Sequence, residues 1–217
     1  MSVDFDAAWH EALGVRPTRL TRGTLRRLLR RHAEPQRYYH TQTHLERMFA
    51  IFLAHREKFK HPRDSQLMML YHDAIYEPEN RDNELQSAHL SRVQLSSWLI
   101  ESRLQRIERW ILATKEHQAL ADEESDDLKM LLDIDLAILA APSDQYQQYA
   151  EQVAQEYAMF SPKVFNQGRQ KALNGLLSRP KIFYTQIVGE DAEWQARMNI
   201  QAELQQLKQQ GRQLRED

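Results

Sequence analysis

Three short stretches hold residues that could do metal or acid–base chemistry. RYYHTQTHLERM places His40 and His44 four residues apart, LMMLYHDAIY places His72 beside Asp73 within an apolar run, and MLLDIDLAIL holds two further aspartates. Because an unpaired imidazole or carboxylate is costly to bury, we expect these side chains to share a partner. A divalent ion accepts both kinds of ligand, so the pattern predicts a metal centre.

Each stretch also has a plain structural interpretation. A lone histidine in a helix is usually satisfied within the core or lies on the surface, and Asp133 or Asp135 could cap a helix or pair with an arginine. An adjacent His-Asp pair among Leu, Met, Ala and Ile has no obvious structural use, and this favours the metal hypothesis. A zinc-protease motif is disfavoured, because Thr41 stands where the motif needs a glutamate after its first histidine.

The elements that carry these residues are predicted to be helices. Apolar residues recur at spacings of three and four, and the six glycines and seven prolines fall mainly between such segments. The only strand candidate is KIFYTQIV, and QALADEES reads as a polar connection. The predicted fold class is all-α, with helices near residues 4–13, from TLRRLLRRH to Pro35, and near 41–59, 63–75, 83–100, 102–117, 126–139, 142–160, 162–177 and 192–209, the last ending at Gly211.

Length and composition fit one soluble domain covering residues 1–217. We expect a metal-site core at about 37–139, with N-terminal basic helices in 1–36 and C-terminal helices in 142–217 packed on it. Cysteine is absent, so thiolate chemistry and disulfides are excluded. No apolar stretch approaches 18 residues and no secretory leader is apparent, so we expect a cytoplasmic protein without a membrane span.

Charge is unevenly distributed although its net value is −2. From Arg16 to Arg37 the chain holds eight arginines and one acid, Glu34. The favoured interpretation is a solvated helix face. The alternative is a surface that binds nucleic acid or attracts phosphorylated substrates. Five other histidines lie on polar faces and are predicted to be surface residues: His10, His32, His55, His61 and His89.

The order of the four central residues resembles the HD superfamily of metal-dependent phosphohydrolases. That resemblance implies a helical bundle whose metal ligands, carried by its central helices, are His44, His72, Asp73 and Asp135. HLERM is similar to the family's first-histidine helix. DIDLAIL is similar to its last-aspartate segment, in which the second aspartate is the ligand. EYAMF, NQGRQKAL and ARMNIQAEL resemble a bacterial branch of predicted HD phosphohydrolases.

The resemblance implies hydrolysis of a small phosphate ester, with nucleotides as the leading class, by attack of a metal-activated water. A site of two imidazoles and two carboxylates with open positions favours Mn, Mg, Fe, Co or Ni over closed tetrahedral Zn. YHTQTH also resembles the YHNxxH stretch of cyclic-nucleotide phosphodiesterases, with Thr41 in place of the asparagine. By that likeness His40 is the proton donor or a phosphate contact; packing at the helix start is its structural alternative.

The remaining candidates are secondary. Glu84, near Ser87, would orient water or move a proton, or would simply lie in the first turn of a helix. Lys115, His117 and Arg169 are candidates for substrate binding; Lys115 and His117 could instead be ordinary residues of a helix C-terminus, and Arg169 could pair with Glu156. A non-catalytic module that senses nucleotides or binds RNA or protein is the alternative function. A homodimer is conceivable, and nothing in the sequence identifies its interface.

Overall fold

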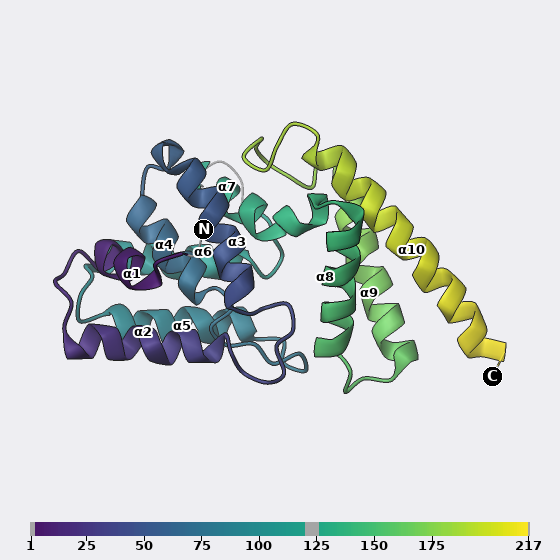
Figure 1. Ribbon diagram of the computed structural model, residues 1–217, viewed down its shortest axis with the longest axis horizontal. Helices are drawn as coiled ribbons and strands as arrows, with labels where there is room; N and C mark the ends of the chain where they lie inside the picture. The colour runs from purple at the N-terminus through teal and green to yellow at the C-terminus, as the bar shows by residue number, and fades with distance from the viewer. Residues whose placement is uncertain (1–2, 120–125, 217) are drawn as a thin grey trace.

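The computed structural model describes residues 3–119 and 126–216, and this part of the chain contains helices and no strand (Figure 1). The predicted all-α class is therefore confirmed. The helices are α1 Phe5–Leu13, α2 Arg19–Arg31, α3 Gln42–Ala54, η1 Arg56–Lys58, α4 Pro62–Tyr71, α5 Asn83–Leu95, α6 Glu101–Ala113, α7 Asp126–Asp135, η2 Leu136–Ala140, α8 Ser143–Glu156, α9 Pro162–Leu177 and α10 Ala192–Glu216. None of them is long and apolar enough to cross a lipid bilayer.

Helices α1 to α7 share one hydrophobic core. Helix α4 lies inside it, and every residue from Asp64 to Tyr71 is buried. Helix α3 contributes Leu45, Met48 and Phe49 at the spacing that the sequence predicted. Since burying apolar area is the main favourable term in folding, this core fixes the ends of α3, α4 and α7 relative to one another.

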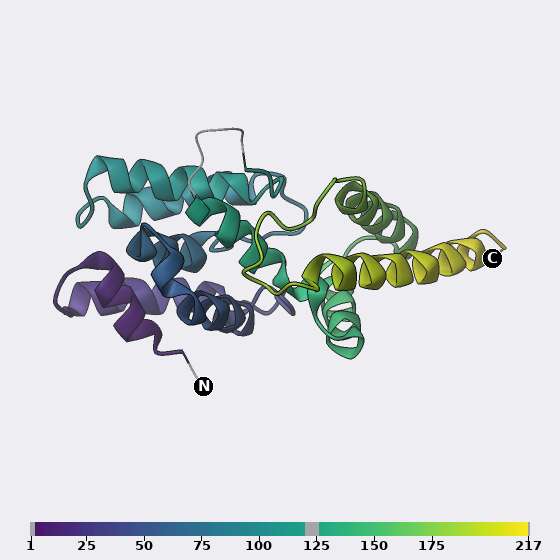
Figure 2. The same ribbon diagram turned by 90° about the horizontal axis from the view of Figure 1, so that it is seen from above.

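Helices α8, α9 and α10 form a second layer at the other end of the molecule, and α7 and η2 lead to it (Figures 1 and 2). Their own apolar cluster includes Leu139, Tyr146 and Leu173. A small third cluster joins Tyr39 of the segment before α3 to Ile138 of η2 and Val153 of α8. The two parts are thus packed together beside the stretch that carries His40.

Several sequence-based boundaries are wrong. Helix α4 ends at Tyr71, so His72 and Asp73 follow the helix instead of interrupting it. KIFYTQIV is irregular, and α10 continues through Gly211 to Glu216. The polar connection QALADEES falls mostly on residues 120–125, outside the described part of the chain.

Two histidines predicted to lie on the surface are buried. His10 bonds Asp6 O through Nδ1 and Thr21 Oγ1 through Nε2, so it joins α1 to α2. His32 has only 1 % of its area exposed, and its Nε2 lies 3.3 Å from the carbonyl oxygen of Leu70. Their polar sequence neighbours concealed this burial. His89 is exposed, as predicted.

Candidate metal centre

Helix ends bring the four predicted ligands together. His44 lies in the first turn of α3, His72 is the C-cap of α4 and Asp73 follows it, while Asp135 is the last residue of α7. His44 and His72 are buried, and the side chain of Asp73 is one-fifth exposed. The shared core therefore positions a nearly closed group of imidazoles and carboxylates.

The ligand atoms converge on a small volume. His72 Nε2 lies 3.3 Å from His44 Nε2 and 2.9 Å from Asp73 Oδ2, and these three residues form a group within 4.8 Å that could hold a metal ion. Asp135 Oδ1 adds a further oxygen, 3.1 Å from His44 Nε2 and 3.5 Å from His72 Nε2. The four residues together offer two nitrogen and two oxygen ligands, from the start of α3 and the ends of α4 and α7.

The chemistry of this donor set fits a cation. His72 Nδ1 lies 2.9 Å from the carbonyl oxygen of Met69, which can only accept a hydrogen bond, so the neutral ring presents a bare Nε2 to the cluster. His44 Nε2 faces it at hydrogen-bond distance, and only one of the two nitrogens can donate there. A divalent ion would take both lone pairs and both carboxylates, and the Met69 carbonyl would fix the ring as outer partners of metal-bound histidines do.

The charges of the cluster act on one another strongly. Burial disfavours the imidazolium form of His72, but the carboxylates of Asp73 and Asp135 outweigh it and raise the pKa of His72 well above its ordinary value. Burial likewise opposes ionisation of Asp135, yet His72, His117 and His44 lower the pKa of Asp135 well below the ordinary range. The site thus attracts positive charge, which a proton or a metal ion could supply.

His117 reaches the same cluster from the turn that follows α6. Its Nε2 lies 2.9 Å from Asp135 Oδ2, while Oδ1 of the same carboxylate lies 3.1 Å from His44 Nε2. The backbone of His117 has φ 44°, a region that non-glycine residues rarely adopt. Arg179 donates to the carbonyl oxygens of His117 and Glu116 at 3.0 and 2.6 Å, so a residue of the C-terminal part holds this conformation in place.

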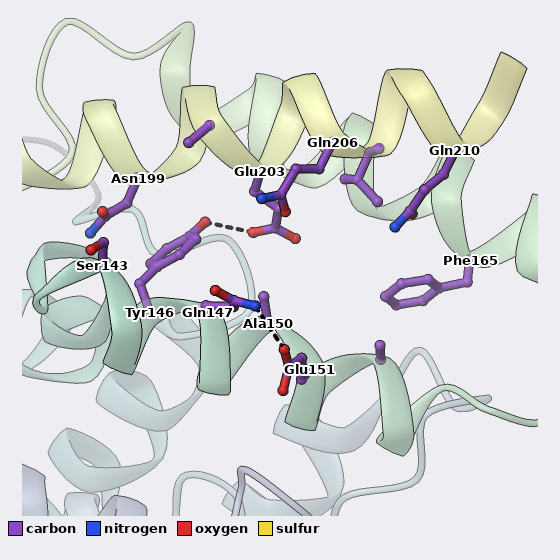
Figure 3. Close-up of a pocket in the computed structure, with 13 residues that line it drawn as sticks. Ser143, Tyr146, Gln147, Ala150, Glu151, Phe165, Asn199, Glu203, Gln206 and Gln210 are labelled. Carbon is purple, nitrogen blue, oxygen red and sulfur yellow. Dashed lines mark hydrogen bonds between the residues drawn. The ribbon is translucent and has the colours of Figure 1, made fainter.

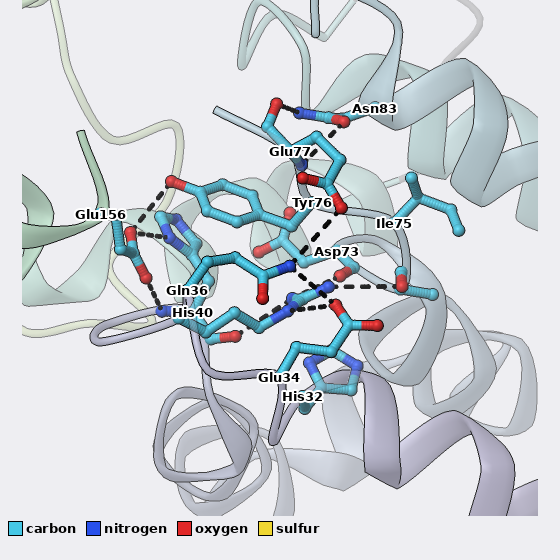
Figure 4. A network of polar contacts seen from close by, with 12 residues as sticks. His32, Glu34, Gln36, His40, Asp73, Ile75, Tyr76, Glu77, Asn83 and Glu156 are labelled. Carbon is cyan, nitrogen blue, oxygen red and sulfur yellow. Dashed lines mark hydrogen bonds and ion pairs between the residues drawn. The ribbon is translucent and has the colours of Figure 1, made fainter. Parts of the chain in front are cut away.

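His40 is held beside the cluster by a carboxylate of α8 (Figure 4). Its Nδ1 lies 2.7 Å from Glu156 Oε2, which also accepts from the hydroxyl of Tyr76 at 2.9 Å. Glu156 Oε1 accepts from the backbone N–H groups of Tyr38, Tyr39 and His40 at 2.8–2.9 Å. Burial opposes ionisation, but these hydrogen bonds lower the pKa of Glu156 to about 2, so it is a carboxylate at neutral pH.

Glu156 is a site residue that the sequence did not predict. The predicted alternative, an ion pair of Glu156 with Arg169, is wrong, because Arg169 bonds Glu203 at 2.7 and 3.1 Å and Tyr149 at 3.2 Å. Glu156 and His40 are 116 residues apart, and no local pattern around EYAMF indicates the contact.

Arg37 was also missed. Predicted within a solvated basic stretch, it is buried and donates to the carbonyl oxygens of His40, Asp73 and Ala74 at 2.8–3.3 Å. Its guanidinium thereby joins the two segments that carry the candidate acid and a candidate ligand. The interpretation of residues 16–37 as a solvated face thus fails for Arg37, whose side chain is buried and holds two segments together.

Other predicted residues lie elsewhere. Lys115 donates to the carbonyl oxygen of Arg81, and Arg169 is taken up by Glu203, so neither side chain contacts the cluster in this structure. Glu84 lies in the first turn of α5, half-buried.

Asp133 has a structural role. Its carboxylate accepts from Tyr184 N, Thr185 N and Thr185 Oγ1 at 2.6–2.8 Å and so anchors the irregular segment 180–191. Of the two aspartates in DIDL, Asp135 is therefore the one that lies at the cluster.

A cavity of about 340 Å³ lies between α8 and α10 (Figure 3). Its buried carboxylate, Glu203, accepts from Tyr146 at 2.6 Å and from Arg169. These partners already satisfy the carboxylate of Glu203. Within residues 3–119 and 126–216, the grouped histidines and carboxylates that could hold a metal are those at His44, His72 and Asp73.

Comparisons of the chain with protein-family models, curated proteins and solved structures found no match. The likeness to HD phosphohydrolases therefore rests on the motifs of the sequence alone.

Proposed function

We propose that this protein is a metal-dependent phosphohydrolase that acts on a small phosphate ester. The observation that carries the proposal is the convergence of His44, His72, Asp73 and Asp135, with imidazole nitrogens and carboxylate oxygens 2.9–3.5 Å apart. Two neutral imidazoles and two carboxylates would leave a divalent site nearly neutral, and Mn, Mg, Fe, Co and Ni accept this ligand set with positions to spare. Such an ion supplies Lewis acidity toward a phosphoryl oxygen and a water of lowered pKa.

His40 is the candidate proton donor to the leaving oxygen. Its Nδ1–H is committed to Glu156, so Nε2 is the atom that remains to exchange a proton with a substrate. Burial opposes protonation, but Glu156 and the nearby charge of Asp73 raise the pKa of His40 above its ordinary value. A histidine that stays protonated near neutral pH suits a general acid.

The bound ester would extend into a cavity that shares residues with the cluster. This cavity, of about 270 Å³, is lined by His44 and Asp135 and by the apolar side chains of Met48, Ile51 and Ile138. Arg47 stands on its wall, exposed, and could contact a second anionic group. The size and lining suit one organic group next to a phosphate, as in a nucleoside monophosphate.

Elemental analysis of purified protein tests the metal site. We expect a divalent metal in the wild type, its loss in Asp73→Ala, and its retention in Asp126→Ala, which removes an exposed carboxylate near the start of α7. Equal metal content in the wild type and Asp73→Ala would contradict the proposal.

A screen of nucleotides and simple phosphate esters with Mn, Mg, Co and Ni tests the reaction. Release of phosphate by the wild type and not by Asp73→Ala is the expected result. Metal retention with nucleotide binding and no turnover on any ester would favour the alternative, a non-catalytic nucleotide-sensing module.

A further inference from the structure

A basic cavity lies at the end of α4 that is remote from the metal centre. It has a volume of about 470 Å³, and five positively charged residues line it: Arg56, Lys60, Arg63, Arg103 and Arg106. These residues come from η1, from the segment before α4, from α4 and from α6, so tertiary packing brings them together. Five cations spread along one solvated helix would not come from four different segments, as these do.

The lining has a positive excess. Two carboxylates, Glu11 and Asp64, face the five cations, which leaves three positive charges even with His61 neutral. The cavity also lies at the N-terminus of α4, whose partial charge has the same sign. One buried carboxylate behind the lining, Asp127, accepts from the backbone N–H groups of Lys60 and His61 at 2.8 and 2.7 Å, so the excess belongs to the side chains that face the cavity. Concentrated charge of one sign in a concave site attracts a ligand of the opposite sign.

Part of the cavity wall is already ordered. Asp64, 3 % exposed, accepts from Arg103 Nε at 2.6 Å and also bonds Arg106, while Arg103 Nη2 donates to the carbonyl oxygen of Ala12 at 2.9 Å. Arg56 is fixed by Glu11. A guanidinium has five N–H donors, so each of these arginines keeps donors for a ligand while its position is set.

Lys60 and Arg63 are the two cations of the lining without a short ion pair, although the charge of Arg63 acts on the carboxylate of Glu11. Lys60 approaches only Asp126, at 3.8 Å with both side chains exposed, a pair of little strength. Arg63 is exposed and has no hydrogen bond or ion pair to any residue of the described chain; its Nη1 lies beside Gly14 at the end of α1. These two cations can turn toward a ligand without breaking a buried contact.

We propose that this cavity binds a compact phosphate-class polyanion, with the pyrophosphoryl group as its simplest form. Planar guanidinium groups pair with phosphate oxygens two at a time, and three excess charges match a ligand with several negative charges. Ten residues of α4 at 1.5 Å each place this cavity about 15 Å from His72, so its ligand is separate from the ester at the metal centre.

Calorimetric titration of inorganic pyrophosphate into protein stripped of metal by EDTA tests the site. We expect one saturable equivalent, bound at least tenfold more weakly by Lys60→Gln/Arg63→Gln. A control that removes the same charge elsewhere, Arg109→Gln/Lys171→Gln, should bind as the wild type does, since both residues are exposed and outside the cavity. Inorganic phosphate should bind more weakly than pyrophosphate.

The metal centre is separated from this site by Asp73→Ala, which should retain pyrophosphate binding. Absence of binding to the stripped wild type, equal weakening in both double variants, or loss of binding in a folded Asp73→Ala protein would each overturn the proposal. If Asp73→Ala does not fold, the isosteric variant Asp73→Asn takes its place, and it too should retain this equivalent. None of these results depends on whether the protein hydrolyses an ester.

Discussion

At the scale of single residues, His40 differs from His44 and His72 in the ring nitrogen that already has a hydrogen-bond partner. Nδ1 bonds Glu156, and the ring lies on Tyr76 with centroids 4.2 Å apart. His44 and His72 instead direct their Nε2 atoms toward each other and toward carboxylates. Two neighbouring histidines four residues apart are thus suited to different tasks, proton transfer for His40 and metal binding for His44.

His40→Asn separates these tasks, because the asparagine amide can replace Nδ1 as the donor to Glu156 but has no counterpart of Nε2. We expect kcat on any ester found in the screen to fall by about 10²–10⁴-fold, the usual contribution of a general acid. Metal content measured by elemental analysis should not change. Loss of metal in His40→Asn would show that His40 is a ligand, and unchanged kcat would remove it from the mechanism.

His32 predicts a pH dependence of stability. It is buried, its Nδ1 has no hydrogen-bond partner in the described chain, and burial, helped by the charges of Arg37 and His72 and opposed by Asp73, lowers the pKa of His32 to about 3. The folded state therefore keeps His32 neutral where the unfolded chain, with a pKa near 6.5, takes up a proton. Stability from this residue is complete above pH 6.5 and is lost as pH falls toward 3.

Urea unfolding at pH 7.0 and pH 4.5 measures that loss. Two pH units below the unfolded pKa correspond to a loss of about 3 kcal/mol from His32. His32→Leu should be less stable than the wild type at pH 7.0, since its hydrogen bond to Leu70 is gone, but should lose about that much less between the two pH values. An identical pH dependence in both proteins would contradict the assignment.

At the scale of elements, the ends of helices make the site. Arg37 donates to the carbonyl oxygens of Asp73 and Ala74 just after α4, where no further helical N–H group is available to bond them. Ser87 of α5 bonds both the N–H and the carbonyl oxygen of Ile75. These contacts fix the direction in which the chain leaves α4 and so the position of Asp73.

Two glycines test the helix ends as the structure describes them. Gly14 caps α1 with φ 71°, and Gly211 lies inside α10 with ordinary space for a Cβ, 3.6 Å from Asn166 Oδ1. We expect Gly14→Ala to lower the free energy of unfolding by about 1 kcal/mol, because a left-handed residue is strained by a Cβ. Gly211→Ala should instead raise it by up to about 1 kcal/mol, since alanine favours a helix interior. Chemical denaturation compares them, and destabilisation by Gly211→Ala would place the end of α10 at Gly211.

The sequence predicted what local patterns determine and missed what distant contacts determine. Periodicity located α9 and the buried face of α3, and the unusual residue pairs pointed to His44, His72, Asp73 and Asp135, which lie together. Glu156 and Arg37 carry no local sign of their roles, since the contacts of Glu156 with His40 and of Arg37 with Asp73 each span more than thirty residues. KIFYTQIV has the composition of a strand, but Asp133 takes the amides of Tyr184 and Thr185 that a neighbouring strand would need.

At the scale of the whole molecule, the C-terminal helices complete a site whose candidate metal ligands all lie before residue 136. Glu156 at the end of α8 holds the segment before α3, and Arg179 holds His117. The apolar contacts of Tyr39 with Ile138 and Val153 lie beside these polar ones. The second layer therefore does more than cover the first, because it sets the geometry of the residue proposed to donate the proton.

This coupling predicts a change in hydrogen exchange far from the substituted residue. The amides of Tyr38, Tyr39 and His40 all donate to Glu156 Oε1, and Glu156→Ala removes that acceptor from buried surroundings. We expect exchange of these amides to speed up at least tenfold, while the amides of α4, held by helix bonds within the core, exchange as before. Ser143→Ala, at the exposed start of the same helix, is the control. The possible outcomes separate three explanations. Unchanged exchange at residues 38–40 would mean that this segment is ordered without α8, and faster exchange throughout α4 would mean that the whole core has loosened. A positioning role for Glu156 requires loss of exchange protection at residues 38–40 alone, together with reduced turnover and retained metal.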